Sequence, residues 1–236
     1  MPASDSASFR HPGTPRGRLL LVRHGESEGN RERRFSPNPE ILLTERGVEQ
    51  ACATAEVIRE HFRPRRIVSS PFRRARDTAQ IIAEAIGHRE SIDVEHDLRE
   101  RAIGELAGQP YAAMRDHPGY VVERFWEWRP AGGESLLDVQ LRAARVLGKL
   151  IAAHPGEEIV VVSHGGVMLA LCAHVEGSWT RFKVARNCEV VVVEHAPGVA
   201  PRIVPGPGEG TGKEEGGVVY RPDPGPRSGS PSDATG

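Results

Sequence analysis

The chain has 236 residues, which is enough for one large domain or two small ones with a sizeable core. No run approaches the roughly 18 consecutive apolar residues of a transmembrane helix, so we expect no membrane-spanning segment. Lysine and arginine (31) nearly balance aspartate and glutamate (32), and this net charge of -1 argues against a protein built mainly to bind nucleic acid.

The N-terminal segment and the cysteines indicate the compartment. The first 17 residues contain no apolar core, so we expect no secretory signal. Cys52, Cys172 and Cys188 are an odd number of cysteines without the spacing of metal ligands. This pattern argues against a disulfide scaffold and is typical of a reducing compartment. We therefore expect a cytoplasmic protein that binds neither a membrane nor nucleic acid.

Both ends of the chain differ in composition from the middle. Residues 1–17 are rich in Pro, Gly and Ser, and residues 197–236 contain 8 Pro and 10 Gly among 40 residues. Such segments bury too little apolar surface to fold, which predicts a disordered N-terminal segment (1–17) and a disordered tail (197–236). The remaining residues, 18–196, are expected to form a single domain.

The first half of this domain predicts two buried strands with a helix between them. The apolar run at 18–22 is typical of a buried strand. Thr44 is a suitable N-cap for a helix that continues to about His61. A second short strand is expected at 66–69.

A second helix follows directly. Ser70 is expected to cap it, with Pro71 at its first helical position and Gly87 after its last turn. Residues 92–95 predict a third, shorter strand.

A long amphipathic helix and the clearest strand come next. Ser135 and Asp138 resemble a capping box that opens the helix. Glu158–Ser163 is the strongest strand prediction. The stripe that we expect the helix to bury consists of apolar residues at helical spacing: Leu137, Leu141, Ala144, Leu147 and Ile151.

The last predicted elements are a helix from Gly165 to about Glu176 and a strand over Glu189–Glu194. Strands and helices alternate throughout, which predicts an α/β fold: a three-layer α/β/α sandwich with a mostly parallel sheet. In such folds, ligands bind beyond the carboxyl ends of the strands.

Two of the predicted strands end in the same kind of sequence. The strand at 18–22 leads into Arg23-His24-Gly25, and the strand at 158–163 leads into His164-Gly165. Arg74 follows the strand at 66–69, so it is expected at the same edge. Arginine binds phosphate oxygens through paired hydrogen bonds, and a neutral histidine is a nucleophile. Together these residues predict a site that accepts a phosphoryl group onto histidine.

Five motifs follow one another along the chain: LLLVRHGESEGN (19–30), SSPFRRARDTA (69–79), LRERAIGELAG (98–108), GGESLLDV (132–139) and VVVSHGG (160–166). In that order they resemble the motifs of the histidine phosphatase superfamily, which is also called phosphoglycerate mutase-like. The triplet RHG alone would be a weak signal, whereas the ordered set is specific. The resemblance covers about residues 19–195 and implies a phosphoglycerate mutase-like fold.

The resemblance implies roles for the residues at the strand ends. His24 would be the nucleophile that becomes phosphohistidine. Arg23 and Arg74 would hold the phosphoryl oxygens. His164, together with the backbone of Gly165, would complete the phosphate pocket.

Two further residues receive roles from the same motifs. Glu100 would be the general acid that protonates the leaving group, and Asn30 would contact the phosphate. If Glu100 does not fill that role, Glu26 and Glu134 are the next candidates, because both lie in motif loops. No HExxH or paired-cysteine pattern occurs, so we expect neither a metal nor a cofactor.

The expected function is therefore hydrolysis of a small phosphorylated metabolite by a metal-independent phosphomonoesterase. The alternatives are phosphoryl transfer of the phosphoglycerate mutase type and a phosphate-binding module that has lost catalysis. Superfamily members that are mutases look longer between the catalytic glutamate and the GES motif, whereas here only about 35 residues separate them. The oligomeric state is left open, with a homodimer among the options.

Two groups of residues remain without a motif. The segment Phe125–Trp128 is expected either to pack a helical cap onto the sheet or to form an apolar lid over the substrate. The other histidines are expected at the surface or in the ends of the chain: His11, His61, His88, His96, His117, His154, His174 and His195.

Overall fold

The computed structural model describes residues 16–181 and 183–206. The chain forms a six-stranded sheet in the order β3-β2-β4-β1-β5-β6. The strands are β1 (Gly17–Arg23), β2 (Arg66–Ser69), β3 (Asp93–Val94), β4 (Glu158–Ser163), β5 (Val190–Ala196) and β6 (Val199–Val204). The α-helices of the described part are α1 (Glu28–Arg31), α2 (Glu45–His61), α3 (Arg73–Ile86), α4 (Ala112–Arg115), α5 (Leu136–Ala153) and α6 (Gly165–Glu176), and the short 3-10 helices are His96–Leu98, Gly104–Leu106 and Val122–Arg124.

The sheet is mixed but mostly parallel. β1 pairs parallel with β4, and β2 pairs parallel with both β4 and β3. β5 runs antiparallel to β1 and to β6. The predicted α/β architecture is therefore confirmed, with an antiparallel hairpin added at one edge.

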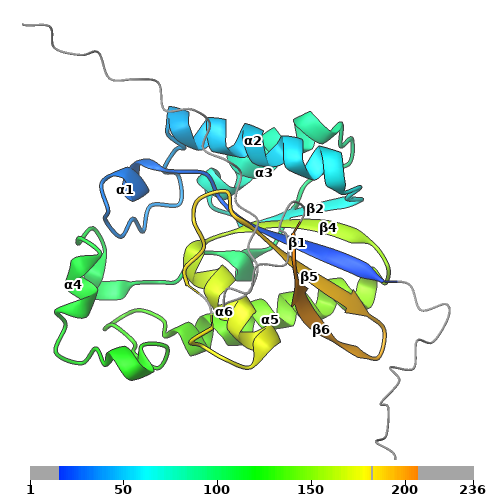
Figure 1. Cartoon of the computed structure of the whole chain (residues 1–236). Coiled ribbons are helices and arrows are strands. Elements are labelled where there is room, and N and C mark those ends of the chain that lie inside the picture. The colour runs from blue at the N-terminus through cyan, green and yellow to red at the C-terminus, as the bar shows by residue number, and fades with distance from the viewer. Residues whose placement is uncertain (1–15, 182, 207–236) are drawn as a thin grey trace, which may run out of the picture.

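Alternate residues of the central strands separate two cores. Leu20 and Val22 of β1 pack with α2 and α3, whereas Leu19 and Leu21 pack with α5 and α6. Figure 1 shows these two helix pairs on opposite faces of the sheet. Because side chains of a strand alternate between faces, a short strand that is apolar throughout must be covered on both sides.

Several predicted boundaries agree with the structure. Thr44 caps α2, because its side chain accepts a hydrogen bond from the backbone N–H of Gly47 at 3.0 Å. Ser135 and Asp138 form the predicted capping box of α5. The helix predicted from Gly165 to about Glu176 has those bounds in the structure.

The predicted cap of α3 is wrong. The helix begins at Arg73, and Phe72 rather than Ser70 is its N-cap. The Ser70 hydroxyl instead lies 2.7 Å from Nε2 of His164. His164, which is distant in the sequence, is therefore the partner of the Ser70 hydroxyl that the local sequence assigned to the helix end. At the other end, Gly87 closes the helix as predicted, with φ of 70°.

The predicted buried face of α5 is only partly right: Leu147 is buried and Ile151 packs against the core, but the other end of the stripe is not buried. Leu137 and Leu141 are 42% and 65% exposed. The buried residues of α5 form a neighbouring stripe on the helix: Leu136, Val139, Arg142, Ala143, Val146 and Leu147. Arginine is rarely buried, so a stripe that contains Arg142 is not the one that an apolar pattern favours.

The sheet extends beyond the predicted end of the domain. β6 pairs with β5 through a hairpin whose turn contains Gly198, with φ of 73°. The segment from residue 197, whose Pro and Gly content predicted a tail, therefore begins with a turn and an edge strand. The domain continues at least to Val204. At the other end, β1 begins at Gly17, which the prediction had placed in the disordered N-terminal segment. Residues 1–15 and 207–236, the rest of the predicted disordered ends, lie outside the described residues.

His195 is buried on β5, at 2% exposure, and not at the surface as predicted. Burial lowers the pKa of its imidazole below the usual 6.5. Within the described ranges, no helix has both the length and the apolar character to cross a membrane.

The loop after β1 lies directly on the first turn of α2, and two glycines allow this. A Cβ at Gly47 would lie 2.1 Å from the backbone oxygen of Glu26, and a Cβ at Gly25 would lie 2.3 Å from the backbone oxygen of Gly47. The atoms that each added Cβ would meet belong to the backbone, which cannot move aside as the end of a side chain can. The close approach of the two segments therefore requires glycine at both positions.

We expect Gly47→Ala to lower the free energy of unfolding by about 1–3 kcal/mol, because the added methyl group forces two backbone segments apart. Gly148→Ala is the matched control, since a Cβ there meets nothing within 4 Å. Because Gly148 lies in the interior of α5, its replacement by alanine should raise the free energy of unfolding by as much as about 1 kcal/mol. Urea denaturation of both variants tests this, and equal stability of Gly47→Ala and the parent protein would contradict the steric argument.

Candidate active site

The two motif histidines lie side by side because their strands are neighbours. β1 and β4 pair so that Arg23 stands opposite Ser163, and each histidine follows directly. The backbone N–H of His24 donates to the backbone oxygen of Ser163 at 2.9 Å. The two imidazole centroids are 5.0 Å apart, and both rings are buried. The predicted convergence of His24 and His164 is therefore present in the fold.

His24 is held with one ring nitrogen available. Its Nδ1 lies 2.7 Å from the backbone oxygen of Gly25, which can only accept a hydrogen bond, so Nδ1 carries the proton. The lone pair is then on Nε2, where Nε of Arg74 donates to it at 3.2 Å. This tautomer directs the lone pair of His24 toward the guanidinium group of Arg74.

Burial keeps both imidazoles neutral. Desolvation, followed by the positive charges of Arg74 and Arg23, holds the pKa of His24 well below its usual 6.5. Desolvation and the same neighbours lower the pKa of His164 as well. A neutral His24 has its lone pair free near neutral pH, as a nucleophile requires.

The site contains two buried nitrogens that lack a hydrogen-bond partner among the described residues. Nε of Arg23 and Nδ1 of His164 find no hydrogen-bond partner within the described part of the chain. Nη1 of Arg23 donates to the backbone oxygen of Ala185 at 2.6 Å, which fixes the guanidinium. Burial lowers the pKa of both Arg23 and Arg74, and each still carries its charge. Buried donors are normally paired, so this arrangement is suited to an anion.

Ser70 contacts the candidate site, a contact that the sequence prediction missed. Its hydroxyl is buried and engages Nε2 of His164, which leaves Nδ1 of that ring as the free nitrogen. The one available signal was its place immediately after β2, at the same edge of the sheet as the histidines.

Asn30 lies in a hydrogen-bonded network beside His24. Its Oδ1 accepts from Nδ2 of Asn187 at 3.0 Å, and that same nitrogen lies 3.0 Å from the backbone oxygen of His24. Its Nδ2 donates to the hydroxyl of Tyr111 at 3.1 Å. Tyr111 and Asn187 were not predicted, because both come from segments without a motif. Contact of Asn30 with phosphate stays a prediction.

Cys188 holds the end of β1 from the side. It has a φ of 58°, and its backbone N–H donates to the backbone oxygen of Arg23 at 3.0 Å. Its backbone oxygen accepts from the Thr54 hydroxyl at 2.9 Å. Burial raises the pKa of the Cys188 thiol to about 12, so this thiol is suited to packing and not to nucleophilic chemistry.

Glu100 reaches the pocket over the first turn of α6. Its Oε1 accepts from the backbone N–H of Arg101 at 2.8 Å. A Cβ at Gly166 would lie 2.7 Å from that oxygen, and a Cβ at Gly165 would lie 3.5 Å from Nε of Arg23. The carboxyl group and the Arg23 guanidinium therefore face adjacent residues of one helix turn.

The two other candidate acids have different surroundings. Glu26 accepts from the Thr44 hydroxyl at 2.9 Å, at the start of α2. Glu134 forms an ion pair with Arg142. Burial by itself would raise the pKa of Glu134, but hydrogen bonds from Arg142 and the backbone of Ala102 bring it below its usual value. A carboxylate that is held ionised in this way is poorly suited to donate a proton.

The aromatic segment divides between two environments. Trp128 is buried in a small core with Ile103 and Leu106, which contains no strand residue, so the segment packs but does not form a helical cap on the sheet as predicted. Trp126 stacks on Trp179, with ring centroids 6.0 Å apart. Within the described residues, no group of three or more His, Cys, Asp or Glu side chains is placed to hold a metal ion.

Comparison with known proteins connects these features to a family. The profile of the histidine phosphatase superfamily (branch 1) matches residues 19–203. A metal-independent phosphoserine phosphatase from Arabidopsis thaliana is 35% identical over 180 residues, which cover 74% of this chain and 75% of that protein. A glucosyl-3-phosphoglycerate phosphatase from Mycobacterium tuberculosis is 36% identical over 169 residues, which cover 66% of this chain and 74% of that protein.

A solved structure agrees with these sequence relatives. The structure of a mycobacterial glucosyl-3-phosphoglycerate phosphatase in complex with VO3 superposes with a TM-score of 0.70 at 32% identity. The match covers 79% of this chain and 96% of that one.

The lowered pKa values predict that His24 and His164 stay neutral where ordinary histidines titrate. In an NMR titration of the protein with ¹⁵N-labelled histidine, both rings should remain unprotonated at pH 6, below the ordinary imidazole pKa of about 6.5. The folded protein should also lose stability as the pH falls below 6.5, because the unfolded chain then binds more protons. Protonation of His24 at or above pH 6.5 in the free protein would contradict this interpretation.

Proposed function

The chain belongs to the histidine phosphatase superfamily, and on that premise we propose that it is a phosphomonoester hydrolase that acts on a small phosphorylated metabolite. The observation that carries the proposal is a neutral His24 whose Nε2 accepts from Nε of Arg74 at 3.2 Å, at a strand end where Nε of Arg23 and Nδ1 of His164 are buried without a partner in the described residues. The relatives are named as phosphatases of phosphoserine and of glucosyl-3-phosphoglycerate, and both substrates are small phosphate monoesters.

In the first step, Nε2 of His24 attacks the phosphorus atom and the bond to the ester oxygen breaks. The phosphoryl group in transfer spreads negative charge over three oxygens. Arg23, Arg74 and Nδ1–H of His164 donate to those oxygens, and Arg74 exchanges its contact with the His24 lone pair for a phosphoryl oxygen. The Glu100 carboxyl gives its proton to the leaving oxygen, so the alcohol departs neutral.

In the second step, water attacks the phosphohistidine. The Glu100 carboxylate takes a proton from this water, the bond between nitrogen and phosphorus breaks, and His24 regains its lone pair. Inorganic phosphate leaves, and Glu100 is again protonated for the next turnover. The bond from Nδ1 of His24 to the Gly25 oxygen holds the ring in one tautomer throughout.

The alternatives are weaker. A mutase must protect the phosphohistidine from water, and the segment between Glu100 and the GES motif is short for that purpose. A phosphate-binding module without catalysis would not need His24, Arg23, Arg74, His164 and Glu100 in one pocket. We also propose that the protein acts in the cytoplasm, which the free thiols of its three cysteines favour, and that it binds neither nucleic acid nor a membrane.

His24→Ala should abolish both turnover and the labelled phosphoenzyme. Arginine and histidine donors supply the positive charge in this mechanism, so EDTA should leave the rate of the parent protein unchanged. The label should be lost in acid and survive in alkali, as expected for phosphohistidine. A label that survives in acid, or activity that chelation removes and Mg²⁺ or Zn²⁺ restores, would contradict the proposal.

Glu100→Gln should lower kcat/KM for an alkyl ester such as phosphoserine by about 10²–10⁴, because the leaving alkoxide needs a proton. It should affect p-nitrophenyl phosphate far less, because p-nitrophenolate leaves without help. Gly166→Ala should reproduce this difference in milder form, since its methyl group displaces only the end of the Glu100 side chain.

Gly148→Ala serves again as the control, because it adds the same methyl group to a helix where nothing is in contact. An equal loss for both esters in Glu100→Gln would mean that this carboxyl group stabilises the site and does not act as the acid.

A further inference from the structure

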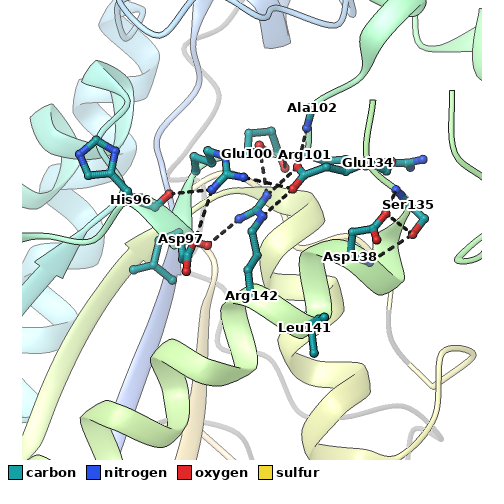
Figure 2. A network of polar contacts seen from close by, with 12 residues as sticks. His96, Asp97, Glu100, Arg101, Ala102, Glu134, Ser135, Asp138, Leu141 and Arg142 are labelled. Carbon is teal, nitrogen blue, oxygen red and sulfur yellow. Dashed lines mark hydrogen bonds and ion pairs between the residues drawn. The ribbon is translucent and has the colours of Figure 1, made fainter. Parts of the chain in front are cut away.

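A buried ion pair lies behind the segment that carries Glu100. Arg142 of α5 and Glu134, two residues before that helix, make two parallel hydrogen bonds: Nε to Oε1 at 2.9 Å and Nη2 to Oε2 at 3.0 Å. The side chain of Arg142 is 4% exposed and that of Glu134 is 16% exposed. Figure 2 shows this pair at the centre of a polar network beside Glu100.

The other donors of Arg142 bind the backbone of that segment. Its Nη1 donates to the backbone oxygen of Asp97 at 2.5 Å, and its Nη2 donates to the backbone oxygen of Glu100 at 3.3 Å. One guanidinium therefore fixes two carbonyl groups, one of which belongs to Glu100 itself. These contacts radiate from Arg142 in Figure 2.

Glu134 binds the same segment on both sides of Glu100. Its Oε1 accepts from Nη2 of Arg99 at 3.3 Å, and its Oε2 accepts from the backbone N–H of Ala102 at 2.9 Å. The carboxylate thus has four donors, two from Arg142 and two from residues that flank Glu100.

Stability alone does not explain this arrangement. A buried ion pair loses much of its Coulombic gain to desolvation, and apolar residues of similar volume are often as stable or more so. What the pair adds is a fixed position for the backbone between 97 and 102. A general acid needs that precision, because an error of about 1 Å at a reacting group can cost a factor of about 10² in rate.

We propose that Arg142 and Glu134 are positioning residues for Glu100, which hold its backbone so that the carboxyl group lies over Gly166 and faces the leaving oxygen. The inference rests on the proposed function, in which Glu100 is the general acid. Neither Arg142 nor Glu134 needs to touch the substrate for this role.

Arg142→Lys tests the proposal, because it keeps the positive charge near His164 and removes the forked geometry. We expect kcat/KM for phosphoserine to fall about 10–100-fold, and that for p-nitrophenyl phosphate to fall less than about 3-fold. In a Glu100→Gln background, Arg142→Lys should cause little further loss with phosphoserine, since residues that act through one group are not additive.

Arg129→Ala is the control. It removes an exposed ion pair to Asp138 at the start of the same helix, and both esters should be turned over at nearly the parent rate. Thermal unfolding of each variant shows whether the fold is retained. If Arg142→Lys does not fold, Glu134→Gln carries the same test, because it preserves the shape of the side chain and removes its charge.

An equal loss for both esters in a folded variant, or a full additional loss in the Glu100→Gln background, would overturn the positioning role and leave the proposed function intact. If Glu100→Gln itself does not distinguish the two esters, the assignment of the acid fails, and the positioning role fails with it.

Discussion

Four groups that can carry positive charge, two imidazoles and two guanidiniums, share one buried pocket, and the site depends on how their mutual repulsion is avoided. Burial and the two arginines suppress protonation of His24 and His164, so only Arg23 and Arg74 are charged. The same positive charges that keep His24 unprotonated make the site favourable for an anion. In the proposed mechanism, the charges of Arg23 and Arg74 thus serve two purposes: they keep His24 unprotonated and they attract the phosphate group.

The parts of this arrangement that the sequence predicts are those with local signals. His24 and His164 each follow an apolar run, and neighbouring parallel strands bring such positions together. The predicted bounds of α6 agree with the structure, in which Gly177 ends the helix in the left-handed conformation. Apolar runs and many helix boundaries have signals that span only a few residues, so they can be recognised before any tertiary contact is known.

The remaining features depend on partners far away in the chain. Ser70 has the sequence of a helix cap, but its hydroxyl belongs to His164, 94 residues later. The prediction for α5 did not place Arg142 on the buried face, because a buried charge is unfavourable by itself. Hydrogen bonds to Glu134 and to carbonyl groups of another segment offset the free energy of burying it. Tyr111 reaches Asn30 from a stretch without periodicity. Pairing of polar groups across long distances leaves no periodic signal in the sequence.

The order of the strands has a consequence for association between molecules. The edges of an open sheet are templates on which a second chain can add a strand. Here one edge is β3, which is only two residues long, and the other is β6, which contains Pro201 beside a break in its register with β5. A proline lacks the N–H that an added strand would need, and a short edge offers few bonds. Within residues 16–181 and 183–206, which the structure describes, both edges of the sheet therefore offer little to a strand added from another molecule.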